Sequence, residues 1–452
     1  MTISSKETIP LTTRFDGAIK RLGPFEQCPK VAVALSGGSD SLCLTLLLQD
    51  WIRKRKGTLI ALTVDHGLRQ ESAQETKLVH TWMNQLGIEH HILQWQGEKP
   101  NSRIQEKARN ARYQLLENWC HSNGILHLFF GHNAEDQNET TLFRLLRGSG
   151  IDGLAGMSAL VEKKYLRILR PLLNVSRETL RQKLSDQNQQ WIDDPSNSSP
   201  KYTRARLRNM LEQYVGENMS EGISPVRVNA LSRCQGLGRI ALEQGTHHFL
   251  AKAVQVFPEG YALLNPKYLD QIPQDTLMRA LSWILMTIGG KSYPPRTNQL
   301  KCLHQQVFSG NNSSARTCWG CIVLKRRDRV LFVRESGRIA QQVPLNSDLR
   351  AYWDHRFVVC WPSSLTLKQQ PLRVAKLGEK GWQQVVTLLS RPLKQRVPAS
   401  AGYALPAIWK GDVVKTVPHL KYGIDLAGAY EDWKSWIFEP ERPMGPPEFM
   451  IA

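Results

Sequence analysis

A short segment of the chain, Ser36–Ser41, has the residue types that bind phosphate groups. Its sequence is Ser-Gly-Gly-Ser-Asp-Ser, and it follows an apolar run typical of a buried strand. The glycines let the backbone turn tightly and approach a ligand, while the serines add hydroxyl donors. A helix beginning here would aim its free N–H groups and its positive dipole end at the same ligand. The segment is not a Walker A loop, because no Gly-Lys-Ser/Thr ends it. We therefore predict a phosphate loop of another type, in preference to a plain strand-to-helix turn with a serine N-cap.

The residues around this loop predict the sheet that positions it. Helical patterns alternate with strand-like apolar runs, which lie near 31–35, 58–64, 88–93 and 125–130. Strands separated by helices of this length imply βαβ units, so the predicted fold class is α/β with a doubly wound, mostly parallel sheet. Polar turns follow the strands that end at Val64 and Phe130. We expect these turns beside the phosphate loop, because such sheets bind ligands at the carboxyl ends of their strands.

The length of 452 residues favours two or three domains. The α/β pattern fills a predicted first domain at 1–215. A polar join bearing Gly and Pro then leads into a mostly helical domain at 216–340, and a small α+β domain follows at 341–452.

The chain is strongly basic: 59 Lys and Arg against 40 Asp and Glu give a formal net charge of +19. This excess favours a polyanionic partner, most simply a nucleic acid, with an anionic membrane surface as the rival. No apolar run approaches the ~20 residues that span a bilayer, and Met1–Phe15 lacks the apolar core of a secretory signal. We therefore expect an intracellular protein without a membrane partner.

Eight cysteines are an ordinary number for a chain of this length in a reducing compartment. Cys318 and Cys321 form the only C-x-x-C, with no second pair nearby and no His at finger spacing. We expect both to be small buried side chains rather than part of a zinc site.

Further motifs occur in order along the chain. They are Val64–Arg69, Ala108–Tyr113, Gly131–Thr140, Arg144–Gly150, Gly153–Met157, Arg170–Leu173, Asp193–Asn197 and the pair Arg204 and Arg208. Together with Ser36–Ser41 they resemble, in order and spacing, the tRNA(Ile)-lysidine synthetase family of the PP-loop, or N-type ATP pyrophosphatase, superfamily. The resemblance is dense over 28–210 and departs from the common pattern at Glu135, where that family frequently has Asp. The later segments resemble the family more weakly, which implies that the second and third domains bind tRNA.

The resemblance implies a two-step reaction. ATP adenylates the C2 carbonyl oxygen of the wobble cytidine, at position 34, in a tRNA(Ile) with a CAU anticodon. The amine of L-lysine then displaces AMP to form lysidine, with pyrophosphate released in the first step. The resemblance therefore implies ATP and Mg²⁺, a cytoplasmic location, and lysine and tRNA as partners; a homodimer remains open.

The predicted site residues follow from these motifs, and their chemistry is compatible with the reaction. The predicted catalytic residues are Asp40, Asp136, Arg112 and His132. The predicted ATP-binding residues are Ser36, Gly37, Gly38, Ser39, Asp40, Ser41, Asp65 and His66. Asp40 and Asp136 are the candidate Mg²⁺ ligands, and Asp136 and Glu139 are the candidate partners of the lysine ammonium. Arg112 is the candidate for stabilising charge on the phosphate.

Basic residues are the candidates for tRNA contact. The predicted contacts are Arg204, Arg208, Lys325, Arg326 and Arg327. The wider segment 163–208 is also rich in charge, with Lys163, Lys164, Arg167, Arg170, Arg177, Arg181, Lys183, Lys201 and Arg206. Arginine suits phosphate contact and stacking on unpaired bases, and the alternative is a solvated face.

Simpler roles are also open for the acidic and basic site residues. Asp136 and Glu139 would serve as helix caps, and Arg112 would pair with Glu106 or Glu117.

Three other functions are alternatives to lysidine formation. A tRNA thiolase of the same superfamily generally needs paired cysteines near the catalytic sheet, whereas this segment has only the separate Cys28, Cys43 and Cys120. A small-molecule ligase would not need the net charge of +19. A non-catalytic RNA-binding protein is disfavoured by the intact phosphate loop.

Overall fold

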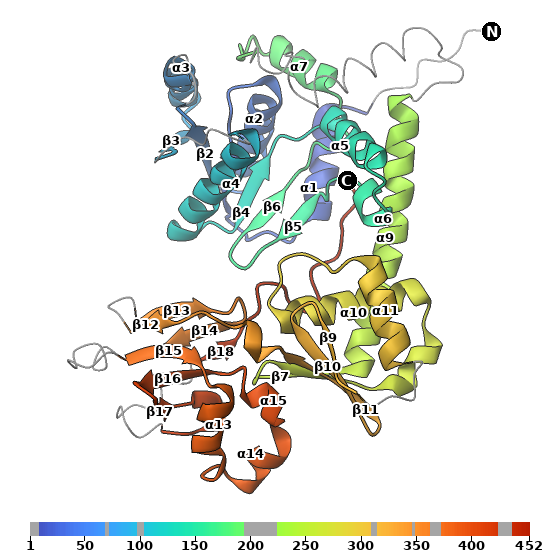
Figure 1. Cartoon of the computed structure of the whole chain (residues 1–452). Helices are drawn as coiled ribbons and strands as arrows, with labels where there is room; N and C mark the ends of the chain where they lie inside the picture. The colour runs from blue at the N-terminus through green and yellow to red at the C-terminus, as the bar shows by residue number, and fades with distance from the viewer. Residues whose placement is uncertain are drawn as a thin grey trace. The chain divides into compact units, whose positions relative to one another are not determined.

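The computed structural model describes most of the chain and divides it into two compact units (Figure 1). One unit is Met1–Ala241 with Pro447–Ala452, and the other is Leu242–Pro446. The described residues are 9–67, 72–96, 104–193, 224–308, 314–345, 349–361, 372–423 and 436–452. The predicted boundary near residue 215 lies outside them, and the division into three domains stays a prediction. None of the helices among these residues is long and apolar enough to cross a bilayer.

The first unit is built on a six-stranded sheet of order β3-β2-β1-β4-β6-β5. The strands are β1 (Lys30–Ala34), β2 (Thr58–Asp65), β3 (Glu89–Gln94), β4 (His127–Phe130), β5 (Leu160–Glu162) and β6 (Arg167–Leu169). Every neighbouring pair is parallel except β5 with β6. The chain runs outward from β1 to β3 and then returns to β4 on the other side of β1. The predicted doubly wound, mostly parallel sheet is confirmed, and its switch point lies between β1 and β4.

Helices cover both faces of this sheet. They are α1 (Leu11–Leu22), α2 (Ser39–Arg53), α3 (Ser72–Gln85), α4 (Ile104–Ser122), α5 (Ala134–Leu146), α6 (Ile151–Leu154), α7 (Arg177–Asp186) and the start of α9 (Pro225–Ala253). Val31 and Val33 of β1 belong to a core shared with α1, α2, α3 and α7. Ala32 and Ala34 point into a second core shared with α4. The apolar run of β1 is therefore buried on both faces, as a central parallel strand requires.

The second unit has antiparallel sheets and two further cores. One core joins α10 (Gln274–Gly289) and α11 (Thr297–Val307) to a five-stranded sheet of order β7-β8-β11-β10-β9. The other contains a four-stranded sheet, β12-β15-β16-β17, and a three-stranded sheet, β13-β14-β18. The strands are β7 (Val254–Phe257), β8 (Tyr261–Leu264), β9 (Arg316–Cys318), β10 (Cys321–Arg326), β11 (Arg329–Arg334), β12 (Val343–Pro344), β13 (Arg350–Trp353), β14 (Phe357–Cys360), β15 (Leu372–Lys376), β16 (Pro406–Lys410), β17 (Val413–Thr416) and β18 (Ile437–Phe438). The helices packed with the last two sheets are α13 (Gly378–Val386), α14 (Arg391–Arg396) and α15 (Ala399–Gly402).

A glycine lets two turns of the first unit touch through their backbones. A Cβ atom on Gly131, just after β4, would lie 2.9 Å from the backbone oxygen of Asp40 and 3.0 Å from the Cα atom of Ser41. These are distances at which the backbone would have to move. Glycine at position 131 therefore allows the turn between β4 and α5 to lie directly against the first turn of α2.

We expect the substitution Gly131→Ala to lower the free energy of unfolding of the first unit by about 1–3 kcal/mol, because the added methyl group overpacks a backbone contact. Urea denaturation measures this change. Gly150→Ala is the matched control, since no heavy atom lies within 4 Å of a Cβ atom built there. Equal stability of the two variants would contradict the close approach.

Candidate active site

The phosphate loop between β1 and α2 is held by its own serines. The backbone N–H of Ser36 donates to Oγ of Ser41 at 3.2 Å, and the two hydroxyl oxygens lie 3.1 Å apart. Oγ of Ser41 also donates to the carbonyl oxygen of Gly38 at 3.0 Å. Gly38 is the N-cap of α2 and has no side chain to occupy the first N–H groups of the helix. Those groups can therefore receive an anion.

Gly37 fixes the path of the loop. Its φ of +83° is a conformation that glycine adopts readily and other residues rarely do. A Cβ atom there would lie 2.7 Å from Val79 and 2.9 Å from Ile192. The carbonyl oxygen of Gly37 accepts the N–H of Ile192 at 2.9 Å. The loop thus lies between α3 and the segment that follows α7, with no room for a side chain.

Two of the predicted carboxylates converge on one arginine. Nε of Arg177 donates to Oδ2 of Asp40 at 3.4 Å, and its Nη2 lies 3.8 Å from Oδ1 of Asp136. The three side chains come from the first turns of α2, α5 and α7. They are between 22% and 26% exposed, so the cluster is sheltered and still accessible to a ligand. The structure therefore brings Asp40 and Asp136 together beside the phosphate loop.

Arg177 is the member of this cluster that the sequence analysis missed. It was counted only among the basic residues of the segment 163–208. Ser176 is the N-cap of α7 and accepts the N–H of Thr179 at 3.3 Å, which makes Arg177 the first helical residue. Burial by itself lowers the pKa of Arg177, but Asp40 and Asp136 raise it above its ordinary value. The Ser-x-x-Thr helix start was visible in the sequence, whereas the position of that start opposite the loop was not.

Asp136 is both a helix cap and an acid with an altered pKa. Its Oδ2 accepts the backbone N–H of Asn133 at 3.2 Å, while Oδ1 of Asn133 accepts the N–H of Asp136 at 2.9 Å. This capping box confirms the simpler interpretation of Asp136, although its other oxygen still faces Arg177. Burial raises the pKa of Asp136 to about 6, with the Asn133 bond and Arg177 acting in the opposite direction. An acid poised near neutral pH is typical of functional sites.

Two glutamates complete the acidic surroundings. Glu139 lies one turn after Asp136 on α5 and is 5% exposed. Oε2 of Glu135 accepts the backbone N–H of Arg177 at 3.0 Å, so Glu135 satisfies the first N–H group of α7. Glu135 and Glu139 thus add two carboxyl groups to α5 beside Asp136.

The predicted Arg112 and His132 lie against the same aromatic ring. The guanidinium carbon of Arg112 is 5.7 Å from the centroid of Phe130, and the ring of His132 stacks on Phe130 at 5.7 Å. Burial lowers the pKa of Arg112, but a guanidinium stays charged in proteins. Glu117, a possible partner of Arg112, pairs instead with Lys163. The structure therefore groups Arg112 and His132 at the carboxyl end of β4.

Asp65 and His66 occupy the turn at the end of β2. Oδ1 of Asp65 accepts the backbone N–H of Gly67 at 2.9 Å, and the ring of His66 meets that of Trp95 edge-on at 6.0 Å. Because β2 pairs in parallel with β1, this turn lies at the same edge of the sheet as the phosphate loop. Contact of these two residues with ATP stays a prediction.

The structure describes only some of the predicted tRNA contacts. Arg204 and Arg208 lie outside the described residues. Lys325 and Arg326 end β10, and Arg327 stands in the tight turn before β11 with a φ of +46°. Arg326 and Arg327 are exposed, so this hairpin presents positive charge at its tip.

Part of the basic segment 163–208 stabilises the fold. Arg170 is 8% exposed and donates to the carbonyl oxygen of Ser158 at 2.9 Å. Arg167 donates to the carbonyl oxygens of Leu22 and Pro24 at 2.9 and 3.0 Å. The expectation that this segment faces RNA is wrong for these two arginines, because their guanidiniums are bonded to carbonyl oxygens of the protein.

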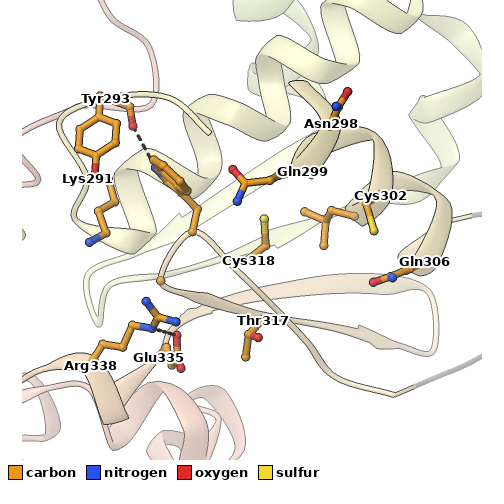
Figure 2. Close-up of a pocket in the computed structure, with 13 residues that line it drawn as sticks. Lys291, Tyr293, Asn298, Gln299, Cys302, Gln306, Thr317, Cys318, Glu335 and Arg338 are labelled. Carbon is orange, nitrogen blue, oxygen red and sulfur yellow. Dashed lines mark hydrogen bonds and ion pairs between the residues drawn. The ribbon is translucent and has the colours of Figure 1, made fainter. Parts of the chain in front are cut away.

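The two cysteines of the C-x-x-C differ in their surroundings. Cys321 is fully buried, and burial raises its pKa to about 12. Cys318 is only half-buried, contrary to expectation, and lines a pocket of about 570 Å³ in the second unit together with Cys302 (Figure 2). Among the residues that the structure describes, no three His, Cys, Asp or Glu side chains are placed to hold a metal ion.

The fold and the loop define a PP-loop protein of the ATP-binding type, and the family described as a PP-loop domain matches residues 11–215. The chain belongs to the tRNA(Ile)-lysidine synthase family, because curated relatives with that name match it along most of its length. One from Orientia tsutsugamushi (strain Boryong) is 30% identical over 429 residues, which cover 94% of this chain and 96% of the relative. One from Wolbachia sp. subsp. Brugia malayi (strain TRS) is 33% identical over 399 residues, or 87% and 89% of the two chains. The family predicted from the motifs is thus confirmed.

The likeness to solved structures is much weaker. The U34-tRNA thiolase NcsA from Methanococcus maripaludis matches with a TM-score of 0.42 and 18% identity, covering 50% of this chain and 77% of that one. Membership of the family therefore rests on the sequence relatives alone.

We expect Asp136→Asn to stabilise the protein at pH 8 by about 1–3 kcal/mol. An acid whose pKa is raised in the folded state, here to about 6, destabilises that state once it ionises. The stability difference should therefore be full above pH 6 and should shrink as the pH falls toward 4. Urea denaturation across this range measures it, with the exposed Asp186→Asn as control. A difference that grew at acid pH would contradict the raised pKa.

Proposed function

We propose that this protein is a cytoplasmic ligase that attaches L-lysine to C2 of the wobble cytidine, at position 34, of a tRNA(Ile) with a CAU anticodon. ATP is converted to AMP and pyrophosphate through an adenylated tRNA intermediate. The observation that supports this most is the carboxylate cluster around Arg177 at the edge of a phosphate loop, in a chain whose relatives are named tRNA(Ile)-lysidine synthase. The net charge of +19 favours a large RNA substrate.

In the first step, the phosphates of ATP bind to Ser36–Ser41 and the first turn of α2. The helix dipole, the free N–H groups and the serine hydroxyls favour negative charge at that point. Arg112 stabilises the charge that develops as pyrophosphate leaves, and His132 contacts the nucleotide or the base. Because these groups are held in place before ATP arrives, little reorganisation accompanies the reaction.

Asp40 and Asp136 fit a Mg²⁺ ion. Mg²⁺ usually takes one or two carboxylates and completes its shell with phosphate oxygens and water. The two carboxylates lie together beside the phosphate loop, which supports such an ion. When bound, the ion would supply charge neutralisation on the phosphates.

In the second step, Asp136 and Glu139 receive the ammonium group of lysine. An amine must lose a proton before it attacks the adenylated base. The raised pKa of Asp136 makes this carboxylate a better proton acceptor than an ordinary aspartate at neutral pH. The same pair of side chains would thus hold the lysine and remove its proton.

A tRNA thiolase is the main alternative within the superfamily, and the cysteines disfavour it. Cys43 and Cys120 are buried in separate cores, and burial raises the pKa of each to about 12. Buried thiols of this kind are inert, because the thiolate is the reactive form.

The decisive experiment incubates the purified protein with ATP, Mg²⁺, labelled lysine and a CAU tRNA(Ile) transcript. We expect label in the tRNA, together with AMP and pyrophosphate. A transcript with uridine at position 34 is the control and should stay unlabelled. Absence of lysine incorporation under conditions where ATP binds would refute the proposed function.

The same assay tests the carboxylates. Asp40→Ala and Asp136→Ala should lower turnover by about 100-fold or more while tRNA affinity stays within about twofold. Asp186→Ala, at an exposed position of α7, should leave both unchanged. A large loss of tRNA binding would mean that the roles of Asp40 and Asp136 are misassigned.

We further propose that residues 216–452 bind the tRNA body, in part through the tip of the β10–β11 hairpin. The double variant Arg326→Ala, Arg327→Ala should weaken tRNA binding and reduce its salt dependence by about 0.9 per lost phosphate contact. Lys20→Ala with Arg21→Ala, two exposed positions on α1, is the control of equal charge. An unchanged salt dependence would support a merely solvated turn.

A further inference from the structure

The last residues of the chain belong to the first unit. Pro447–Ala452 form one compact unit with Met1–Ala241, although the chain between them runs through the whole second unit (Figure 1). Phe449 is 5% exposed, and Met450 and Ala452 pack against the core that contains β1 and α2. This segment, Pro447–Ala452, is called the tail below. It is packed into the first unit, and no step of the proposed reaction uses it.

The tail is bonded to the loop that follows α6. The N–H of Met450 donates to Oγ of Ser158 at 3.0 Å, and the N–H of Ala159 donates to the carbonyl oxygen of Met450 at 2.8 Å. Oγ of Ser158 in turn donates to the carbonyl oxygen of Leu160 at 2.6 Å. The loop at 155–159 thus has the tail as its partner on one side.

The tail also packs on α9, at a glycine. A Cβ atom on Gly236 would lie 2.9 Å from the side chain of Ile451 and 3.2 Å from that of Phe449. The guanidinium carbon of Arg239 lies 4.5 Å from the ring centroid of Phe449, and α9 also bonds the loop through Ser232 Oγ, which donates to the carbonyl oxygen of Ala155. Close approach at Gly236 lets the tail reach the loop.

The other side of this loop is bonded to the catalytic helix α5. The N–H of Met157 donates to Oε1 of Gln137 at 2.7 Å, and Nε2 of Gln137 donates to the carbonyl oxygen of Met157 at 3.1 Å. Gly156 has a φ of +74°, and a Cβ atom there would lie 2.7 Å from the amide of Gln137. Gln137 directly follows Asp136 and lies two residues before Glu139. The path from the tail to the carboxylates is therefore continuous and short.

We propose that the segment Pro447–Ala452 is a positioning element for the reaction. It fixes the loop 155–159, whose two bonds to Gln137 fix the first turn of α5 and with it Asp136 and Glu139. This inference rests on the proposed function, because its consequence is the placement of the groups that receive lysine. The tail follows Leu242–Pro446 in the chain, so the intact protein carries this element covalently attached.

Deletion of Pro447–Ala452 tests the proposal directly. We expect the turnover number to fall between about 10-fold and about 100-fold, because catalysis is sensitive to misplacement of about 1 Å. The KM for ATP and the affinity for tRNA should change by less than about twofold. The synthetic peptide Pro-Glu-Phe-Met-Ile-Ala, added in excess, should restore turnover, and a scrambled peptide should not. Full activity of the deletion variant would overturn the proposal.

Gly236→Leu displaces the tail without shortening the chain, and Cys234→Leu adds the same side chain at an exposed position of the same helix. Gly236→Leu should lower the turnover number as the deletion does, and Cys234→Leu should leave it equal to that of the unaltered protein. If Gly236→Leu stays fully active, or if both tail variants lose the cooperative unfolding of the first unit, a positioning role is refuted.

Amide hydrogen exchange separates this inference from the proposed function. Loss of the tail should increase exchange at Met157 and at the first turn of α5, whereas α4, which packs into the other core, should be unaffected. This readout needs no activity, so it stands even if the unaltered protein fails to form lysidine. Unchanged protection at Met157 and α5 would overturn the inference alone.

Discussion

The candidate active site depends on one guanidinium that holds two carboxylates at the starts of three helices. Arg177 begins α7, Asp40 lies in the first turn of α2, and Asp136 lies in the first turn of α5. Each helix start favours negative charge, through its dipole and its free N–H groups. Carboxylates satisfy that preference but repel one another, and Arg177 offsets the repulsion. The close approach at Gly131 and the bond from the N–H of Arg177 to Glu135 bring these helix starts within reach.

The position of Asp136 has opposite effects on the stability of the fold. The capping box of Asn133 and Asp136 stabilises the start of α5, yet burial of the same carboxyl raises its pKa to about 6 and makes its ionised form costly. The apolar cores on both faces of β1 supply the stability that this site lacks. A group held this way can accept a proton near neutral pH because the fold, and not the group itself, maintains its position.

Several supports of the site come from distant parts of the chain. Gln137 is bonded by Met157, and the loop around Met157 is bonded by Met450, nearly three hundred residues later. Sequence patterns gave the strands, the helices and the phosphate loop, since these depend on periodicity and on adjacent residues. They gave no indication that the tail returns to the first unit, because a short irregular segment of this kind leaves no periodic signal.

The α/β class, the phosphate loop, the family and the candidate carboxylates can all be predicted from the order of the residues. The packing of distant segments places Arg177 beside Asp40 and Asp136, gives Arg167 and Arg170 their backbone acceptors, and leaves Cys318 half-buried. The two groups of features differ because they depend on interactions that reach over different distances along the chain. Turns, caps and amphipathic periods act over a few neighbouring residues, whereas ion pairs, burial and altered pKa values depend on which distant segments pack together.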